Sequence, residues 1–338
     1  MRKLVSVIAA ATIMLIALCA SGAVGSTGVV TAQEAAVVPS PPEQVAAAET
    51  TSGPSFTQGV SVTDAHRTAT IDRWGIQRIE VPAAWDAARS FAPVLVAVID
   101  TGIDPCVPFA TRVKAGIDFS GSGSTDDEHG HGTHMAGTIA AIAPNASFVN
   151  LKVADKRGRC ETDTVAKAIR WAADRGAQVI NVSLEVEPTK ALQSAVEHAS
   201  AVGAIVVAAA GNSGSSRPAY PAAYTDALAV AGTNEADKLA ILSNHGDWVD
   251  IAAPGFKVYS ELPDGEFGLE TGTSPAAAHV SGVAALALGV AEDTNGNGHT
   301  ADEVRHALES GAGPLLQTGT GSGIVNALQT VKALCQAS

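Results

Sequence analysis

The sequence predicts an α/β fold of three layers, in which a mostly parallel central sheet carries helices on both faces. One observation is the continuous apolar run from Val94 to Ile99, which is typical of a strand buried on both sides. Another is that such runs alternate with segments of helical length. The composition agrees, because 46% apolar residues, 16% charged residues and 33 glycines suit helices packed closely on a sheet.

The predicted elements follow one another along the chain. Strands are expected at 94–99, directly after 145, and at 178–182, 204–210 and 228–232. Helices are expected at 82–88, 163–175, 188–203, 275–288 and 301–308. Thr162 or Asp163 is the expected N-cap of the second helix, and Gly176 ends it. The segment 293–298 between the last two helices is predicted to be a polar turn.

The whole-chain numbers exclude some classes of function. A length of 338 residues allows one large domain or two smaller ones. A net charge of −13 argues against nucleic-acid binding, which relies on clusters of lysine and arginine. Aromatic residues make up only 4% of the chain, so a base-stacking surface is not expected either.

The N-terminus has the pattern of a secretion signal. Arg2 and Lys3 precede an apolar run from Leu4 to Ala20, and Ser21-Gly22-Ala23 offers a cleavage site of small residues. We therefore expect residues 1–23 to be a signal peptide and the product to be secreted. An uncleaved membrane anchor is the alternative. A lipid anchor on Cys19 is disfavoured, because the bulky Leu18 precedes it.

Residues 24–70 are rich in Ala, Pro and Ser and show no sustained periodicity, so a flexible segment or short propeptide is expected there. Three cysteines follow, Cys106, Cys160 and Cys335. Export permits one disulfide among them, in any of three pairings, and buried free thiols are the alternative.

Three short blocks contain an acid, a base and a nucleophile in the order Asp100, His131 and Ser274. A serine hydroxyl is inert near neutral pH until a histidine accepts its proton and a carboxylate orients that histidine. Asp100 ends the first buried strand, at the edge where parallel sheets bind their ligands. Ser274 precedes a proline and an apolar run, so it is also the expected N-cap of the 275–288 helix.

These blocks resemble those of the subtilisin-like serine proteases, from about Trp74 to about Lys332. They are Asp100-Thr101-Gly102, the run from Gly130 to Thr138, and Gly272-Thr273-Ser274. The resemblance implies a peptidase domain over 71–333, with 334–338 as a tail, and a serine endopeptidase that acts on protein or peptide substrates as a monomer. It implies His131 as general base, Asp100 as its orienting carboxylate and Ser274 as nucleophile. Pro275 and Ala278 depart from the family pattern.

The run from Ala208 to Gly214 resembles the oxyanion block of the same family, which implies that Asn212 donates to the tetrahedral intermediate. The substrate-binding residues implied by the resemblance are Ser183, Leu184, Glu185, Ala209 and Gly211. Glu185 and Val186 stand where the family usually has two glycines. Glu185 could favour a basic P1 residue, Val186 could narrow the pocket, or the loop could be shifted.

Metal binding is not required for this chemistry, and no cofactor is expected. The spacing His129-x-His131-x-x-His134 invites a zinc interpretation, but it lacks the His-Glu-x-x-His arrangement, and His134 is expected to be structural. The calcium loop that many subtilases carry after the histidine helix is missing between Thr138 and Asn145. Calcium binding therefore stays possible, although the loop that usually binds it in this family is missing.

Two other functions are compatible with the sequence. A peptide-binding pseudoprotease would keep the fold and hold peptides in a cleft modified at Glu185 and Val186. A membrane-tethered processing protease would keep the segment from Leu4 to Ala20 attached. Labelling by a serine-directed probe separates the first from an active enzyme, and the mass of the mature N-terminus separates the second.

Overall fold

The computed structural model describes residues 73–88 and 90–336. The expected signal peptide (1–23) and the Ala/Pro/Ser-rich segment (24–70) lie outside the described residues. Within the described part of the chain, no helix has both the length and the apolar character needed to cross a membrane.

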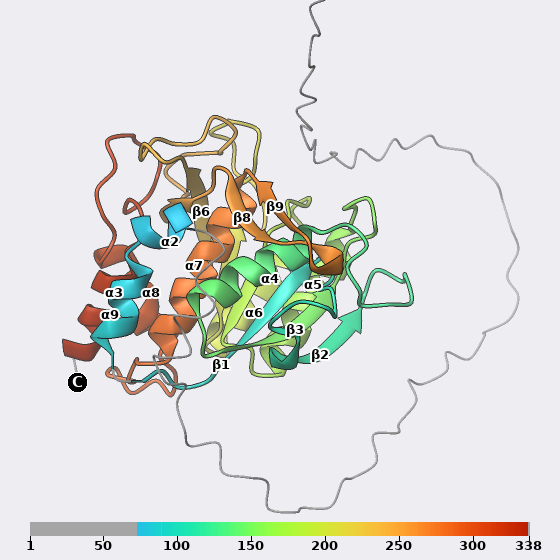
Figure 1. Ribbon diagram of the computed structural model, residues 1–338, viewed down its shortest axis with the longest axis horizontal. Coiled ribbons are helices and arrows are strands. Elements are labelled where there is room, and N and C mark those ends of the chain that lie inside the picture. Colours follow the sequence, from blue (N-terminus) through green and yellow to red (C-terminus); the bar gives the residue numbers. More distant parts are fainter. Residues whose placement is uncertain (1–72, 89, 337–338) are drawn as a thin grey trace, which may run out of the picture. The chain divides into compact units, whose positions relative to one another are not determined.

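Seven strands form one parallel sheet, which confirms the predicted fold class (Figure 1). Its spatial order is β2-β3-β1-β4-β5-β6-β7, and every neighbouring pair is parallel. The strands are β1 (Val94–Asp100), β2 (Val113–Asp118), β3 (Ala146–Lys152), β4 (Val179–Val182), β5 (Ile205–Ala209), β6 (Ala227–Thr233) and β7 (Ile251–Pro254).

Helices cover both faces of this sheet. The central pair on one face is α4 (His131–Ile142) and α7 (Thr273–Leu288), and the other face carries α5 (Thr162–Asp174) and α6 (Lys190–Ala201). Four more helices pack on the side of α4 and α7: α2 (Arg73–Arg78), α3 (Val81–Ala87), α8 (Ala301–Ser310) and α9 (Ala327–Gln336). The last of these continues past residue 333, the boundary expected for the domain.

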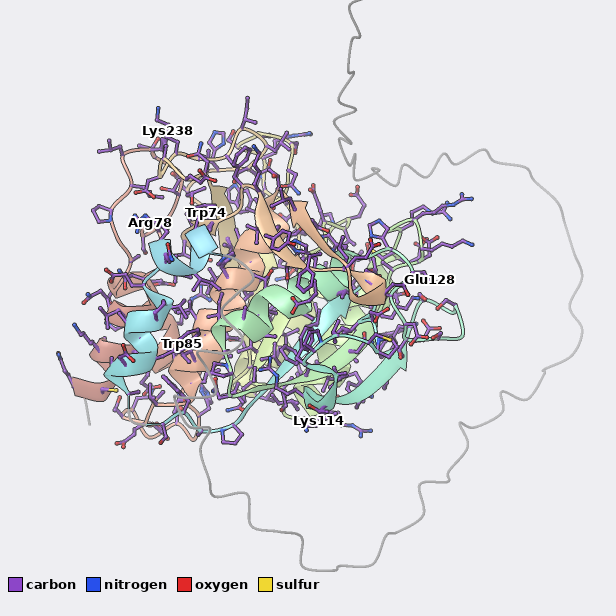
Figure 2. The ribbon with its side chains drawn as sticks, in the orientation of Figure 1. Trp74, Arg78, Trp85, Lys114, Glu128 and Lys238 are labelled. Atoms are coloured by element: carbon purple, nitrogen blue, oxygen red, sulfur yellow. The ribbon has the colours of Figure 1, made fainter. Side chains whose placement is uncertain are left out.

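The two central helices are buried along their whole length. Every residue of α4 and of α7 is buried, so neither helix has a face exposed to solvent. Alanine and glycine account for five of the twelve residues of α4 and seven of the sixteen of α7, and such small side chains let a helix approach a sheet and its neighbouring helices closely. Trp85 of α3 (Figure 2) joins that helix to the end of α4, because its indole N–H donates to the carbonyl of Ile142 at 2.9 Å.

The strand order places the ends of β1 and β4 side by side. The chain runs from β1 outward to β2 and β3 on one side, and then crosses to β4 on the other. Ile99 pairs with Val182, so Asp100 and Ser183 both follow at the carboxyl edge of the sheet. Ligands bind at such a point in open parallel sheets, because the loops there diverge and leave a crevice.

The predicted starts of two helices, α5 and α6, differ from the structure. Helix α5 is capped by Glu161, with no side-chain hydrogen bond, and not by Thr162 or Asp163. Helix α6 begins at Lys190, because the Thr189 side chain accepts a hydrogen bond from the Leu192 N–H and so fixes the start. The sequence pattern also missed β2, β7, α9 and an antiparallel hairpin of β8 (Val258–Glu261) and β9 (Phe267–Glu270).

Two cysteines differ from the expected alternatives. Cys106 and Cys335 are solvent-exposed, so the expectation of buried thiols is wrong for these two. Neither of them forms a disulfide within the described residues. Partial burial raises the pKa of the Cys335 thiol above its ordinary value, which keeps it in the less reactive protonated form near neutral pH.

Candidate active site

Asp100 and His131 are joined by a direct hydrogen bond. Asp100 is the last residue of β1 and fully buried, and His131 is the first residue of α4 and 8% exposed. The imidazole Nδ1–H donates to Asp100 Oδ1 at 2.7 Å, and the same oxygen accepts the Thr101 N–H at 2.7 Å. This pairing leaves Nε2 as the nitrogen that can accept a proton from a nucleophile.

Asp127, which no sequence motif indicated, fixes the loop that leads into α4. Its Oδ1 accepts from the backbone N–H groups of His129 and Gly130 and from the Thr101 hydroxyl. Its Oδ2 accepts from the N–H and the hydroxyl of Thr133. Burial opposes ionisation, but these hydrogen bonds hold the pKa of Asp127 below its ordinary value. The ionised carboxylate thus ties the end of β1 to the start of α4.

Glycine is required at the contact between these two elements. A Cβ atom on Gly132 would clash with the carbonyl oxygen of Gly102, and would lie 3.1 Å from the Cβ of Asp100. The Gly132 N–H donates to Thr101 Oγ1 at 2.9 Å. Only a residue without a side chain therefore lets the helix approach β1 closely enough for the His131–Asp100 bond.

A second carboxylate faces the other nitrogen of His131. Glu270, the last residue of β9, places Oε2 at 4.0 Å from Nε2, and its side chain is 22% exposed. Burial disfavours the charged imidazole, but the negative charges of Asp100 and Glu270 outweigh it and raise the pKa of His131 to about 10. Burial raises the pKa of Glu270 to about 7, and the positive charge of His131 opposes that rise.

Ser274 lies in the first turn of α7, next to the end of β4. Its Oγ donates to the carbonyl of Ser183 at 3.3 Å, and the Ser183 hydroxyl donates back to the Ser274 carbonyl at 3.3 Å. The predicted cap is wrong, because α7 begins at Thr273 with Gly272 as N-cap. Pro275 is tolerated there because the first N–H groups of a helix have no partner within the helix.

Asn212 supplies the missing cap. Its Oδ1 accepts the N–H of Thr273 at 2.8 Å, so a side chain from the loop after β5 holds the start of α7. This bond orients the Asn212 amide beside the first turn that carries Ser274. The structure therefore brings Asn212 and Ser274, 62 positions apart in sequence, to one helix terminus, where free N–H groups favour negative charge.

The substrate-binding candidates lie along the ends of β4 and β5. Ser183 to Glu185 continue β4 beyond the sheet, Ala209 is the last residue of β5, and Gly211 lies two residues beyond it. Among them, Glu185 directs its carboxylate at Gly211: a Cβ on that glycine would lie 2.8 Å from Glu185 Oε2. Val186 turns elsewhere, because its N–H donates to the Tyr220 carbonyl and its side chain packs on the α5 and α6 side of the sheet.

The three neighbouring histidines do not form a metal site. His134 is fully buried and donates from Nε2 to the Val258 carbonyl at 3.0 Å, as expected of a structural residue. Burial, assisted by the positive charge of His131, lowers the pKa of His134 to about 4. Across residues 73–88 and 90–336, no group of three or more acidic, histidine or cysteine side chains could hold a metal ion.

Two loops, residues 143–145 and 293–298, carry polar side chains. Only residues 143–145 separate α4 from β3, and the amide of Asn145 donates to the carbonyls of Ala92 and Ala285. In the predicted polar turn, Asp293 accepts from the N–H groups of Gly296 and Gly298, which confirms the turn. The polar side chains of Asn145 and Asp293 thus have hydrogen-bond partners within the fold.

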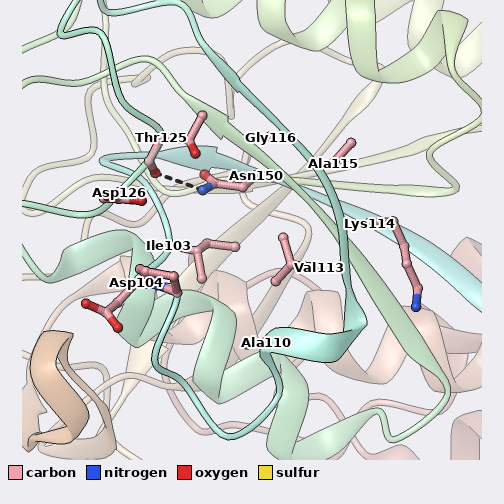
Figure 3. A pocket seen from close by; sticks show the side chains of 11 residues that line it. Ile103, Asp104, Ala110, Val113, Lys114, Ala115, Gly116, Thr125, Asp126 and Asn150 are labelled. Atoms are coloured by element: carbon pink, nitrogen blue, oxygen red, sulfur yellow. Dashed lines mark hydrogen bonds between the residues drawn. The ribbon is translucent and has the colours of Figure 1, made fainter.

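A pocket of about 330 Å³ lies at the edge of the sheet by β2 (Figure 3). Ile103, Val113, Lys114 and Asn150 are among its lining residues, and Asn150 donates to the Thr125 carbonyl at 2.8 Å. None of the catalytic or substrate-binding candidates lines this pocket. This hollow is therefore separate from the candidate residues at the carboxyl edge of the sheet.

Comparison with known proteins identifies the family to which the chain belongs. A model of the Subtilase family, peptidase S8, matches residues 92–329. The chain is 39% identical over 275 residues to thermitase of Thermoactinomyces vulgaris, covering 77% of this chain and 96% of that protein. It is 39% identical over 266 residues to subtilisin BL of Lederbergia lenta, covering 75% and 96%. A solved protease structure from Pseudoalteromonas arctica matches with a TM-score of 0.68 and 29% identity, over 77% of this chain and 94% of that one.

Proposed function

The chain belongs to the subtilase family and is a subtilisin-like serine protease, and from this premise we propose that it is a secreted endopeptidase whose triad is Asp100, His131 and Ser274. The observation that carries the proposal is the hydrogen bond of 2.7 Å between Asp100 Oδ1 and His131 Nδ1, beside a serine held at a helix terminus. Proteins and peptides are the substrates, and no cofactor takes part in the reaction.

Acylation starts when the Ser274 hydroxyl exchanges its Ser183 acceptor for Nε2 of His131. Nε2 takes the proton while Oγ forms a bond to the scissile carbonyl carbon, and the carbonyl oxygen becomes an oxyanion. Asp100 stabilises the resulting imidazolium through Nδ1–H. The imidazolium then gives its proton to the leaving amine, the C–N bond breaks, and an acyl-enzyme remains on Ser274. Water, deprotonated by His131, hydrolyses that ester in the second half of the cycle.

The Asn212 amide and the Ser274 N–H receive the oxyanion. The start of α7 supports this role, since the first N–H groups of a helix lack partners within the helix and its dipole is positive there. Because Oδ1 of Asn212 already accepts the Thr273 N–H, the amide nitrogen of that side chain is the group left to donate.

The segment Ser183–Glu185 binds the substrate backbone by adding it as a strand, and Glu185 selects lysine or arginine at P1. This choice among the three sequence alternatives is supported by the carboxylate of Glu185 beside Gly211 and by the packing of Val186 away from it. Burial raises the pKa of Glu185, and the positive charge of Arg217 opposes that rise. A basic P1 side chain would compete with Arg217 for the same carboxylate.

A peptide library varied at P1 tests this proposal. We expect cleavage after Arg and Lys to exceed cleavage after Leu, and Glu185→Gln to reduce the Arg-to-Leu ratio of kcat/KM by about fivefold to tenfold. The exposed neighbour Glu187 gives the matched control, since Glu187→Gln should leave the ratio nearly unchanged. A ratio that Glu185→Gln leaves intact would assign the P1 pocket to other residues.

Secretion is supported by the signal pattern of residues 1–23. The mass of the protein recovered from the culture medium tests it, and a mature N-terminus beyond residue 20 is the expected result. Retention of the segment from Leu4 to Ala20 in a membrane fraction would favour the tethered processing protease. A folded, exported chain that binds peptides without cleaving them would favour the pseudoprotease.

A further inference from the structure

The general base of this site lies between two carboxylates. Asp100 Oδ1 is 2.7 Å from Nδ1 of His131, and Glu270 Oε2 is 4.0 Å from Nε2. Asp100 is the usual orienting partner in a Ser-His-Asp triad, so its presence needs no further explanation. Glu270 is different, because it faces the nitrogen that must exchange protons with Ser274 and the substrate.

The fold holds Glu270 in this position from two directions. It ends β9, where it pairs with the buried Val258 of β8, and Thr271-Gly272 connect it to the start of α7. The Gly272 N–H donates to the Gly255 carbonyl at 2.8 Å and anchors that connection. The hairpin is thus fixed close to Ser274, and the Glu270 side chain is only partly exposed.

Other charged groups surround His131 but cannot replace Glu270. Asp127 precedes α4, and both of its carboxylate oxygens already accept hydrogen bonds from backbone N–H and hydroxyl groups. His129, in the same loop, has its pKa lowered, mainly by burial and then by the charge of His131. His134, one turn along α4, donates to the Val258 carbonyl. Glu270 is the carboxylate placed at Nε2.

We propose that Glu270 is a positioning residue of the reaction: its carboxylate holds the imidazolium form of His131 in the resting site and thereby moves the onset of activity to alkaline pH. The inference rests on the proposed triad. Nε2 accepts the Ser274 proton only when it carries a lone pair, so whatever favours the imidazolium delays the competent state. An opposite charge at this distance in a partly buried site has that effect.

The titration of the two groups agrees in sign. As pH rises through about 7, Glu270 loses its proton and becomes the counter-ion of a charged His131. His131 then loses its own proton only near its raised pKa of about 10. Because the two groups interact, the acid limb of the rate profile belongs to the pair. Removing the Glu270 charge lowers the pKa of His131 and moves the acid limb to lower pH.

The same carboxylate has an opposite effect once the reaction begins. His131 is an imidazolium in the transition state, and Glu270 stabilises that charge as it develops. We therefore expect Glu270→Gln to be faster than the natural protein between about pH 7 and about pH 10, where Glu270 is charged and His131 is still an imidazolium, and slower on the alkaline plateau. Below about pH 7 Glu270 is protonated, so the two proteins should react at similar rates. A residue that serves only the fold would lower the rate at every pH and would give no such crossing.

The experiment is the pH profile of kcat/KM between about pH 5 and about pH 11 on an uncharged peptide. Three proteins are compared: the natural chain, Glu270→Gln, and Glu266→Gln, an exposed control on the same hairpin. The expected result is an acid limb lowered by about one pH unit in Glu270→Gln and unchanged in Glu266→Gln. A displacement below about half a unit, or an upward one, overturns the proposal.

A titration of the His131 imidazole by NMR separates this proposal from the proposed function. Glu270→Gln should lower the midpoint of His131 whether or not the protein hydrolyses peptides. If no protein in the series is active and the midpoint still falls, the proposed function fails and the role of Glu270 at His131 stands. If the midpoint is the same in both proteins, the role of Glu270 is refuted even in an active enzyme.

Discussion

At the scale of single residues, Asn212 performs two tasks that different substitutions can separate. Its Oδ1 caps α7 through the Thr273 N–H, and its amide group is the proposed oxyanion donor. Alanine removes both functions. Aspartate keeps an acceptor for the Thr273 N–H but has no donor, so stability and catalysis should respond differently to the two changes.

For Asn212→Ala we expect kcat to fall by about 10²–10³, the loss found when subtilisin itself loses such a donor. We also expect the free energy of unfolding to fall by about 0.5–2 kcal/mol, because the cap is lost. Asn212→Asp should lose the activity and keep the stability. Urea denaturation and steady-state kinetics on both variants check this, and an active Asn212→Asp would remove Asn212 from the oxyanion site.

At the scale of elements, the junction of β1 and α4 depends on Asp127. Both of its oxygens face donors, so asparagine at this position would turn an amide N–H toward a backbone or hydroxyl donor. We expect Asp127→Asn to destabilise the protein by about 1–3 kcal/mol and to reduce kcat/KM, since the His131 loop loses its anchor. Asp126→Asn, an exposed neighbour, is the control. Equal stability of the two variants would contradict this account.

The elements show which features of the fold can be read from sequence. Strands β1, β4, β5 and β6 are continuous apolar runs because both of their faces are covered, and all four were predicted within one or two residues. Strand β2 was missed because it is one of the two edge strands of the sheet, and its exposed residues Lys114, Ala115 and Gly116 interrupt the apolar pattern. The β8–β9 hairpin was missed because each of its strands is only four residues long, and the apolar Phe267 and Leu269 of β9 are exposed rather than buried.

The site shows the same division. Motifs indicated the candidate catalytic residues, and a hydrogen bond of 2.7 Å joins two of them, His131 and Asp100. The predicted cap at Thr162 was wrong because α5 already starts after the preceding residue, Glu161. The predicted cap at Ser274 was wrong because α7 starts at Thr273, whose N–H donates to Asn212 in a distant loop. Asp127 lies only four positions before His131, yet nothing in sequence spacing indicates that it receives five hydrogen bonds. The contact of Glu270 with His131 becomes visible only in the folded structure, where the β8–β9 hairpin lies beside α4.

At the scale of the whole molecule, the charges at the site make stability depend on pH. The folded-state pKa values of Glu270 and His131, about 7 and about 10, lie above their ordinary values of 4.5 and 6.5. The folded chain therefore binds more protons than the unfolded one between these values. The stabilisation from both groups is fully present below the ordinary values and is lost as pH rises through about 7 and then about 10.

We expect the urea midpoint to decrease from about pH 5 to about pH 10, and the decrease to be smaller in Glu270→Gln. Asp127 acts in the opposite direction, because its pKa is lowered on folding and its contribution is lost when pH falls through the acidic range. Denaturation curves at several pH values check both limbs. A midpoint that rises through the alkaline range would contradict the assigned charges.

Covalent labelling with a fluorophosphonate, followed by peptide mapping of the adduct, is the most direct test of the proposed triad. We expect one adduct on Ser274 in the exported protein, none in Ser274→Ala, and much slower labelling in His131→Ala, because the base is then missing. A folded protein that forms no adduct, or that is still labelled in Ser274→Ala, would show that Ser274 is not the nucleophile activated by His131 and Asp100.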